Sequence, residues 1–395
     1  MRFITVVSLL LTFGLDASGI EFFVLQGIDR THPDDVLQSP GLDGFTIRVS
    51  WKKLQDEGFA WLDEQVRRGD ELNVNMQLRV LAGASAPADM PGVAYFDYQS
   101  TEFGGAVEMR RVPVPWDPIM RAQWQELATN LGSRYGDNPR IKVVHVPSFA
   151  NSSELHMPIE VTQIAGYSSR GLAESWAAMA APLAAAFPHA TVSLNYATPT
   201  QARITGDDSQ WLIDELAILA ADRAGYQAND LAADVDLARN KYQTLVEQHE
   251  LGRQIGFQMV SSSNLPRFGG DFLEAVDTAL QAGAQWLEIY AADIVRIPPP
   301  GDYNLNGTTD AADYIIWRAT NGQTGSGLAA DGDANNRIDA ADYQLWRANF
   351  GVTSDDGSPA IASAPEPSSH LLLLPAAALL VFPSVGRKRG AASRN

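Results

Sequence analysis

The sequence has 395 residues, of which 47 are Asp or Glu and 29 are Lys or Arg, so its formal net charge is −18. An acidic surface repels a phosphate backbone, and we therefore expect no nucleic-acid partner. The absence of cysteine excludes disulfides and thiolate metal sites, so any bound metal must have oxygen or imidazole ligands.

The first 19 residues have the order of a secretory signal. Arg2 precedes the apolar run 3–13, and the small residues Ala17, Ser18 and Gly19 follow it. The run is too short to span a bilayer. A buried first strand is the alternative, because the apolar stretch EFFVLQG (21–27) follows at once. We predict a signal peptide over residues 1–19 and export of the protein.

Residues 20–297 alternate between strand-like and helix-like patterns. The strand-like runs are EFFVLQG (21–27), GFTIRVSW (44–51), NVNMQLRVL (73–81), IKVVHVP (141–147), ATVSLNY (190–196), QIGFQMV (254–260) and AQWLEIY (284–290), and AGYQANDLA (224–232) is a short candidate for an eighth. Apolar residues at helical spacing lie between them, at Met120, Trp124, Leu127, Leu131 and Tyr135, at Leu172, Trp176, Met179 and Leu183, and at Leu273, Val276 and Leu280. The pattern predicts an α/β fold, a (β/α)8 TIM barrel, with a doubly wound open sheet as the alternative.

Candidate catalytic residues follow the strands of this barrel, where barrel enzymes carry their sites. The fourth strand runs into SFANSSELHMP, which contains Asn151, Glu154 and His156. Alternation with period two puts Trp286, Glu288 and Tyr290 on one face of the last strand, and Thr46, Arg48 and Ser50 on one face of the second. A cation on an inward face needs an anionic partner, and Glu288 or Glu154 could supply it to Arg48.

Two carboxylates that face one site are the minimum for cleaving a glycosidic bond. Glu154 and Glu288 are the catalytic candidates, although Glu154 could be an ordinary loop acid and Glu288 a structural partner of Arg48. Arg48, Asn151 and His156 are candidates for substrate binding. Trp51, Trp286 and Tyr290 could stack on sugar rings or belong to the core. Without HExxH or clustered histidines, we expect no zinc and no other cofactor in the barrel.

Two segments carry a resemblance to a known family. GFTIRVSWKKL resembles the second-strand segment of retaining glycoside hydrolases of the large clan with (β/α)8 barrels, and SSELH is similar to the position of that clan's acid/base glutamate. The resemblance implies that Glu154 protonates the leaving oxygen. The chain departs from the clan at Ser153, where the clan has Asn, and in the seventh strand, where QMVSSSN has no carboxylate for a nucleophile. The role of Glu288 as nucleophile, base or structural residue stays open.

After a proline linker (298–300), the phrase DAADYIIWRA (310–319) recurs as DAADYQLWRA (339–348). The loops that lead into the two copies carry oxygen side chains at positions 1, 3, 5, 9 and 12. These are Asp302, Asn304, Asn306, Asp310 and Asp313, then Asp331, Asp333, Asn335, Asp339 and Asp342. A calcium loop of this spacing also uses a backbone carbonyl at position 7, here Thr308 and Arg337, and a left-handed turn at position 6, here Gly307 and Asn336. The spacing predicts two Ca²⁺ sites.

The whole segment 301–352 resembles a type I dockerin, a small all-α calcium-binding domain with paired EF-hand-like loops. The resemblance implies docking to a cohesin-like protein. Loop positions 10 and 11, which help to select the cohesin in that family, are Ala-Ala in both copies, at 311–312 and 340–341. Whether the partner is a cohesin therefore stays open.

The C-terminus begins with a linker rich in Ser, Asp, Gly and Pro (353–364), followed by Pro365-Glu366-Pro367. An apolar segment (371–385) and the basic Arg387, Lys388 and Arg389 come next. Residues 365–389 resemble a PEP-CTERM sorting signal, which implies sorting machinery, transient membrane anchoring and a cell-surface or extracellular location. Our hypothesis is an exported glycoside hydrolase acting on a polysaccharide or oligosaccharide, and the alternative is a noncatalytic surface barrel that binds glycans or a protein.

Overall fold

The computed structural model describes residues 20–100, 107–150, 154–325, 328–333 and 335–354. The predicted signal peptide, nearly all of the linker 353–364 and the predicted sorting signal lie outside these described residues. Within them, no helix has both the length and the apolarity that crossing a membrane requires.

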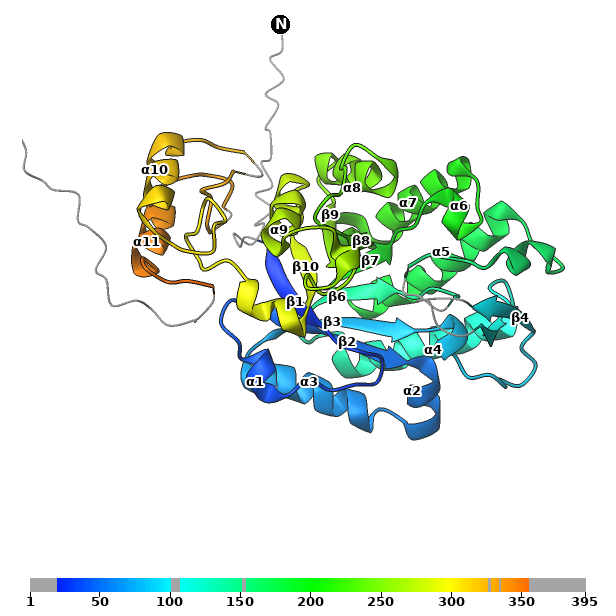
Figure 1. The fold of residues 1–395 in the computed structure, drawn as a ribbon. Coiled ribbons are helices and arrows are strands. Elements are labelled where there is room, and N and C mark those ends of the chain that lie inside the picture. The colour runs from blue at the N-terminus through cyan, green and yellow to red at the C-terminus, as the bar shows by residue number, and fades with distance from the viewer. Residues whose placement is uncertain (1–19, 101–106, 151–153, 326–327, 334, 355–395) are drawn as a thin grey trace, which may run out of the picture. The chain divides into compact units, whose positions relative to one another are not determined.

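Eight parallel strands form a closed barrel in the order β1-β10-β9-β8-β7-β6-β3-β2 (Figure 1). They are β1 (Glu21–Leu25), β2 (Gly44–Ser50), β3 (Asn75–Leu81), β6 (Ile141–Val146), β7 (Thr191–Asn195), β8 (Ala224–Leu231), β9 (Gln254–Met259) and β10 (Trp286–Tyr290). The first and last strands pair in parallel, with Glu21 opposite Trp286 and Leu25 opposite Tyr290. This closure confirms the predicted barrel and excludes the open sheet, and β8 confirms the eighth strand.

Helices surround the barrel (Figure 1). They are α1 (Asp34–Leu37), α2 (Trp51–Glu57), α3 (Ala60–Leu72), α4 (Pro118–Tyr135), α5 (Ser169–Ala186), α6 (Pro199–Ala202), α7 (Gly206–Ala220), α8 (Asn240–Glu250) and α9 (Phe272–Gln281). The start of α4 is encoded locally, because Pro118 occupies its first turn and the Asp117 carboxylate accepts from the amides of Ile119 and Met120. The helix-spaced apolar residues of α4 and α5 are buried against the strands, as predicted.

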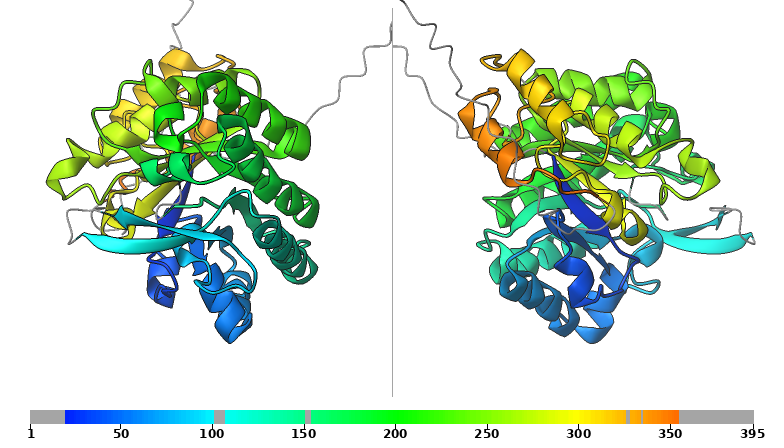
Figure 2. Two further views of the ribbon diagram at one scale, coloured as in Figure 1. Left: turned by 90° about the vertical axis from the view of Figure 1, so that its right-hand side faces the viewer. Right: turned by 60° about the vertical axis from the view of Figure 1, so that its left-hand side comes forward.

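A β-hairpin that the sequence analysis did not predict follows β3. Its strands, β4 (Tyr95–Ser100) and β5 (Glu108–Pro113), pair antiparallel and project from the barrel in both views of Figure 2. Phe96 and Tyr98 are buried, whereas the charged residues Asp97, Glu108 and Arg111 are exposed. β4 has one charged residue and β5 has three, and in two strands of six residues each the alternation that is typical of a half-buried hairpin is short.

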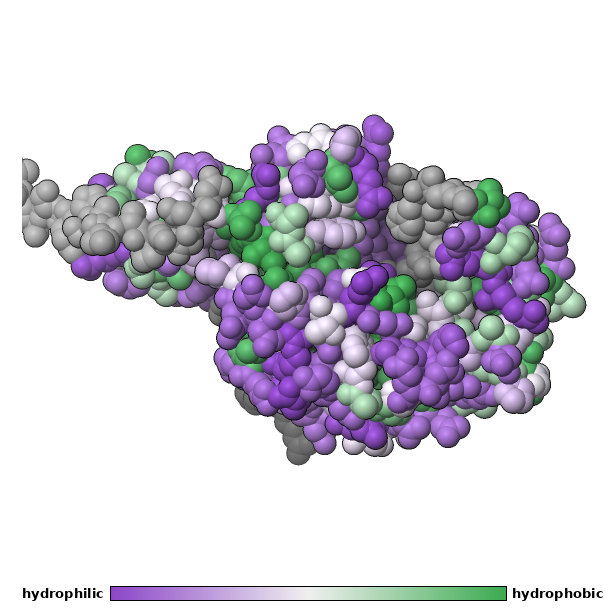
Figure 3. Space-filling model, turned by 60° about the horizontal axis from the view of Figure 1, so that its bottom comes forward, coloured by the Kyte–Doolittle hydropathy of each residue, from purple (hydrophilic) through white to green (hydrophobic). Residues whose placement is uncertain are grey.

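The repeated segment contains the helices α10 (Ala311–Thr320) and α11 (Ala340–Ala348). Their packing is reciprocal: Trp317 Nε1 donates to Asp339 O and Trp346 Nε1 donates to Asp310 O, both over 2.7 Å. The repeated sequence therefore produces a repeated contact. The face of the molecule in Figure 3 is largely hydrophilic, in keeping with the net charge of −18.

Candidate functional site

The amino end of the barrel interior is closed by apolar side chains. Phe23 on β1, Val143 on β6 and Trp286 on β10 form a separate buried cluster. Gly256 on β9 makes room for the indole, because a Cβ atom there would lie 2.0 Å from Trp286 Cε2. Trp286 is 2% exposed. Its ring therefore offers no face to a sugar, and the sugar-stacking role considered for it is corrected to a core role.

Glu288 occupies the next layer of the interior and is completely buried. Its Oε1 accepts from Thr46 Oγ1 over 2.5 Å. Its Oε2 accepts from Arg79 Nη2 over 2.7 Å and from Gln227 Nε2 over 2.6 Å. Burying a carboxylate is costly unless a cation and hydrogen bonds compensate it, and here both are present. The structure thus holds Glu288 as a fully bonded anion.

Arg79, on β3, is the ion-pair partner that the sequence analysis sought in Arg48. The Arg79 and Glu288 side chains are 1% and 0% exposed, and Arg79 Nη1 also donates to Gln258 Oε1 over 3.0 Å. The prediction that Arg48 pairs with Glu288 or Glu154 is therefore corrected. The signal was present, because Gln77 and Arg79 alternate within the apolar run NMQLRVL in the way that identified Arg48 on β2.

His145 on β6 lies beside this ion pair. Arg79 Nη2 is 3.5 Å from both ring nitrogens, and the ring is held between the side-chain amides of Asn195 and Gln77 over 3.0 and 2.9 Å. Burial, and then the positive charge of Arg79, hold the pKa of His145 well below its usual range. His145 is therefore neutral, and the buried carboxylate of Glu288 pairs with Arg79.

Arg48 and Tyr290 lie towards the carboxyl ends of β2 and β10. Arg48 Nη1 donates to the backbone oxygen of Gln26 over 3.2 Å. Burial and Arg79 lower the pKa of Arg48 to about 10, against the opposing effect of Glu288. Burial also raises the pKa of Tyr290, although Arg267 and Arg48 act in the opposite direction. These two predicted substrate-binding residues therefore lie near Glu288, on the side away from the apolar cluster at the amino end of the barrel.

Glu154 lies beyond the carboxyl end of β6 and is 7% exposed. Its Oε1 accepts from Lys241 Nζ over 2.7 Å and from the Asn229 amide over 3.1 Å. Its Oε2 is 3.3 Å from His156 Nε2. Burial lowers the pKa of Lys241, but Glu154 and Asp230 outweigh it, so that the pKa is raised and Lys241 is a cation. The structure thus places His156 beside Glu154 and pairs Glu154 with Lys241, while Asn151 lies outside the described residues.

Strand β8 connects the two candidate carboxylates. Gln227 Nε2 donates to Glu288 and also to Asn229 Oδ1, over 2.6 and 2.7 Å, and the backbone amide of Asn229 donates to Glu154. Two residues of a strand advance about 6.6 Å. Glu154 and Glu288 therefore belong to successive layers of one continuous hydrogen-bonded network at the carboxyl end of the barrel.

Trp51 is not part of this network. It begins α2, is 3% exposed and packs edge-on against Trp124, with ring centroids 5.6 Å apart. It also lines a cavity of about 420 Å³ with Leu54 of α2 and Leu127 of α4. The role considered for Trp51 in sugar stacking is therefore corrected to helix packing.

The two loops of the repeated segment curl in the same way. Asp313 accepts from the amides of Asn304 and Asp310, and Asp342 accepts from those of Gly332 and Asp339. The left-handed turns at position 6 are confirmed, with φ of 83° at Gly307 and 62° at Asn336. In the first loop, Asp302 also accepts from the amides of Asn306 and Gly307.

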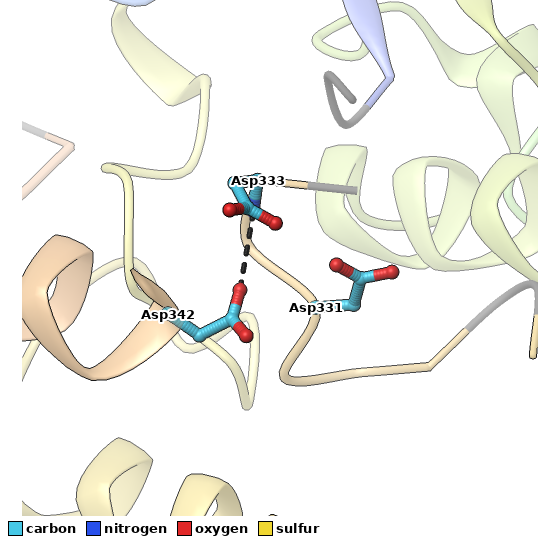
Figure 4. A group of neighbouring side chains, drawn as sticks. All are labelled: Asp331, Asp333 and Asp342. Carbon is cyan, nitrogen blue, oxygen red and sulfur yellow. Dashed lines mark hydrogen bonds between the residues drawn. The ribbon is translucent and has the colours of Figure 1, made fainter. Parts of the chain in front are cut away.

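The second loop brings carboxylates together. Oxygens of Asp331, Asp333 and Asp342 lie within 4.8 Å of one another, and the three side chains face a common point in Figure 4. Asp331 Oδ1 is buried and has no hydrogen-bond partner among the described residues. Burial, together with Asp342 and Asp333, raises the pKa of Asp331 to about 6. An orphaned carboxylate oxygen among hard oxygen donors fits a calcium ion.

Arg79, Lys241 and Gln227 are functional candidates that were not predicted from the sequence. Lys241 lies on α8 and Gln227 on β8, far along the chain from the glutamates that they bind. Only the closure of the barrel brings these segments together, and no spacing within the sequence carries that information.

No protein-family model matches the chain, and neither does any curated protein sequence. Several solved structures are similar to it. One described as a glycoside hydrolase has a TM-score of 0.45 and 9% identity over 69% of this chain and 88% of its own. Xylanase 10B from Thermotoga petrophila, solved with xylobiose, has a TM-score of 0.43 and 12% identity over 69% and 82%. An intracellular xylanase from Thermoanaerobacterium saccharolyticum, solved with xylotriose, has a TM-score of 0.42 and 13% identity over 69% and 85%.

Proposed function

We propose that the barrel is a glycoside hydrolase that acts on a polysaccharide or oligosaccharide through Glu154 and Glu288. The observation that carries this proposal is the network in which Gln227 and Asn229, on one strand, bond the two carboxylates in successive layers. Cleavage of a glycosidic bond needs a proton donor to the leaving oxygen and a second carboxylate for the positive charge that develops on the sugar.

In this proposal Glu154 is the proton donor. Lys241 and the Asn229 amide both contact its Oε1, which leaves Oε2, near His156, as the oxygen that can carry the proton. Once the proton has passed to the leaving oxygen, the ammonium 2.7 Å from Oε1 stabilises the negative charge that remains.

Glu288 is suited to the second role. Arg79, Thr46 and Gln227 keep it as an oriented anion in a dry interior, where a fixed charge stabilises a developing positive charge more strongly than in water. In this proposal Glu288 acts as nucleophile or as base for a water molecule, once a sugar is bound above it.

The test is a screen of polysaccharides for release of reducing ends, using the full chain and the variants Glu154→Gln and Glu288→Gln. Removing a general acid or base costs about 10²- to 10⁴-fold in rate, and we expect each variant to lose at least 10²-fold while it still binds the glycan. Glu57→Gln, a surface change on α2, is the matched control and should retain the activity of the unchanged protein. Equal turnover by all four proteins would contradict the proposal.

One observation favours a second candidate, a noncatalytic barrel that binds a glycan or a protein. Glu288 is 0% exposed and both its oxygens are already bonded, which is also what a structural carboxylate requires. For this candidate, the screen should give binding without any release of reducing ends, and the Glu288→Gln variant should lose stability rather than turnover.

We also propose that residues 301–352 bind two calcium ions, which would stabilise the curled loops, and that they dock to a cohesin-like protein. The paired loops and the reciprocal tryptophan contacts support this role. Export with transient anchoring by residues 365–389 is proposed from the sequence alone. Cell fractionation of the full chain and of a chain ending at residue 364 tests it, because only the full chain should pass through the membrane fraction.

A further inference from the structure

Arg48 forms no ion pair among the described residues, although the negative charge of Glu288 acts on it. Its one hydrogen bond among the described residues goes to the backbone oxygen of Gln26, and its Nε is buried with no partner. The neighbouring Arg79 already uses the carboxylate of Glu288. Arg48 is half-buried, and a guanidinium in that position that bonds only a neutral carbonyl lacks the compensation that such charges normally have.

The side chain of Gln26 has the same deficiency. It is 5% exposed, yet neither its Oε1 nor its Nε2 has a partner among the described residues. An amide buried without hydrogen bonds is costly, and such groups are usually satisfied by a ligand or by ordered water.

Arg48, Gln26 and Tyr290 come from three adjacent strand ends. Leu25 of β1 is paired with Tyr290 of β10 and with Thr46 of β2. Gln26 is the next residue after Leu25, and Arg48 comes two residues after Thr46. Thr46 reaches Glu288 within the barrel, and the alternation along β2 directs Arg48 to the same interior, one layer nearer the carboxyl end. The three residues thus lie at one corner of the carboxyl end of the barrel, beyond the level of Glu288.

We propose that this corner binds the carboxylate of an acidic sugar, a uronic acid residue of the glycan. A guanidinium presents two parallel N–H groups that match a carboxylate, and the Gln26 amide can donate a third hydrogen bond. The hydroxyl groups of a neutral sugar would satisfy the amide but leave the charge of Arg48 uncompensated. This inference rests on the proposed function for the identity of the ligand as a sugar, and it deepens that function by naming the substrate class.

The experiment compares ligands that differ only in charge. Calorimetric titration of the full chain with D-galacturonate and D-glucuronate, each against its own methyl ester, isolates the contribution of the carboxylate. We expect at least one acid to bind about tenfold more tightly than its ester, since a hydrogen bond to a charged group is worth roughly one such factor or more. Arg48→Met should abolish this preference, and Arg48→Lys should retain part of it because the charge stays and the fork is lost.

Arg67→Met, at an exposed arginine of α3, is the matched control and should keep the preference. Gln26→Met gives a second reading if circular dichroism shows that Arg48→Met is unfolded, and it should weaken binding of the acid more than of the ester. The inference is overturned if neither acid is preferred to its ester, or if the preference persists in the variants Arg48→Met and Gln26→Met. Selective binding of the acid without any glycan cleavage would refute the proposed hydrolase activity and support the carboxylate site. Cleavage of neutral glycans without selective binding of the acid would support the hydrolase activity and refute the carboxylate site.

Discussion

Replacing Arg79 by methionine should be among the most destabilising single changes in the barrel. The substitution leaves Glu288 buried without its cation, since the two side chains are 1% and 0% exposed, and it also removes the donor to Gln258. Breaking a buried pair from one side costs about 3 to 5 kcal/mol, which is a large part of the roughly 5 to 15 kcal/mol that stabilises a domain. The double variant Arg79→Met/Glu288→Gln should recover about 2 kcal/mol, because neither charge of this pair then remains buried.

Urea unfolding followed by tryptophan fluorescence measures these differences in the free energy of unfolding. Arg67→Met is the control, because this arginine is exposed and should leave the unfolding midpoint unchanged. A loss below about 1 kcal/mol for Arg79→Met would refute the reasoning, since it would mean that Glu288 does not depend on Arg79. A double variant as unstable as the sum of the two single variants would refute it equally.

Three further predictions concern the interior and the repeated segment. Gly256→Ala should destabilise the barrel by about 1 to 3 kcal/mol or more, because the added Cβ would lie 2.0 Å from Trp286, and Gly206→Ala, where the added atom meets nothing within 4 Å, is the control for the same urea measurement. Because the pKa of His145 is lowered in the folded state, its contribution to stability is complete above about pH 6.5 and is lost as the pH falls below that value; unfolding measured from pH 8 to 5 should show this slope, and His145→Gln should flatten it. Calcium should raise the melting temperature of the repeated segment and a chelator should lower it, whereas Asp331→Asn should weaken the response of one loop; a melting curve that ignores the ion would count against both sites.

The sequence predicted seven strands of the barrel well because each is a short, mostly apolar run with clear borders, whereas 224–232, with Gln227, Asn229 and Asp230, was only a candidate for the eighth. The predicted stretches 21–27, 141–147 and 224–232 became β1, β6 and β8 with ends shifted by no more than two residues. The closed barrel was predicted because eight candidate strands were found over about the length that a (β/α)8 barrel requires. The hairpin β4-β5 was not predicted because each strand has only six residues and β5 is rich in charge.

The candidate site was predicted only in part, since a sequence pattern identifies inward-facing residues but not their partners. Alternation placed Glu288 and Arg48 inside the barrel correctly. It could not decide that Arg79, two strands from β1, would reach Glu288 while Arg48 would not, because that depends on side-chain length across the interior. Trp51 and Trp286 were considered for sugar stacking because aromatic type alone does not distinguish a binding platform from a core residue.

The most direct test of the central claim is the dependence of the Glu154→Gln variant on the leaving group of its substrate. A proton donor matters for a poor leaving group and is dispensable for a good one. We predict that kcat/KM falls by at least about 10²-fold on the natural glycan and on phenyl glycosides, yet stays close to that of the unchanged protein on dinitrophenyl glycosides of the same sugar. Equal losses on all of these substrates, or no loss on any of them, would contradict the assignment of Glu154 as the acid of a glycosidase.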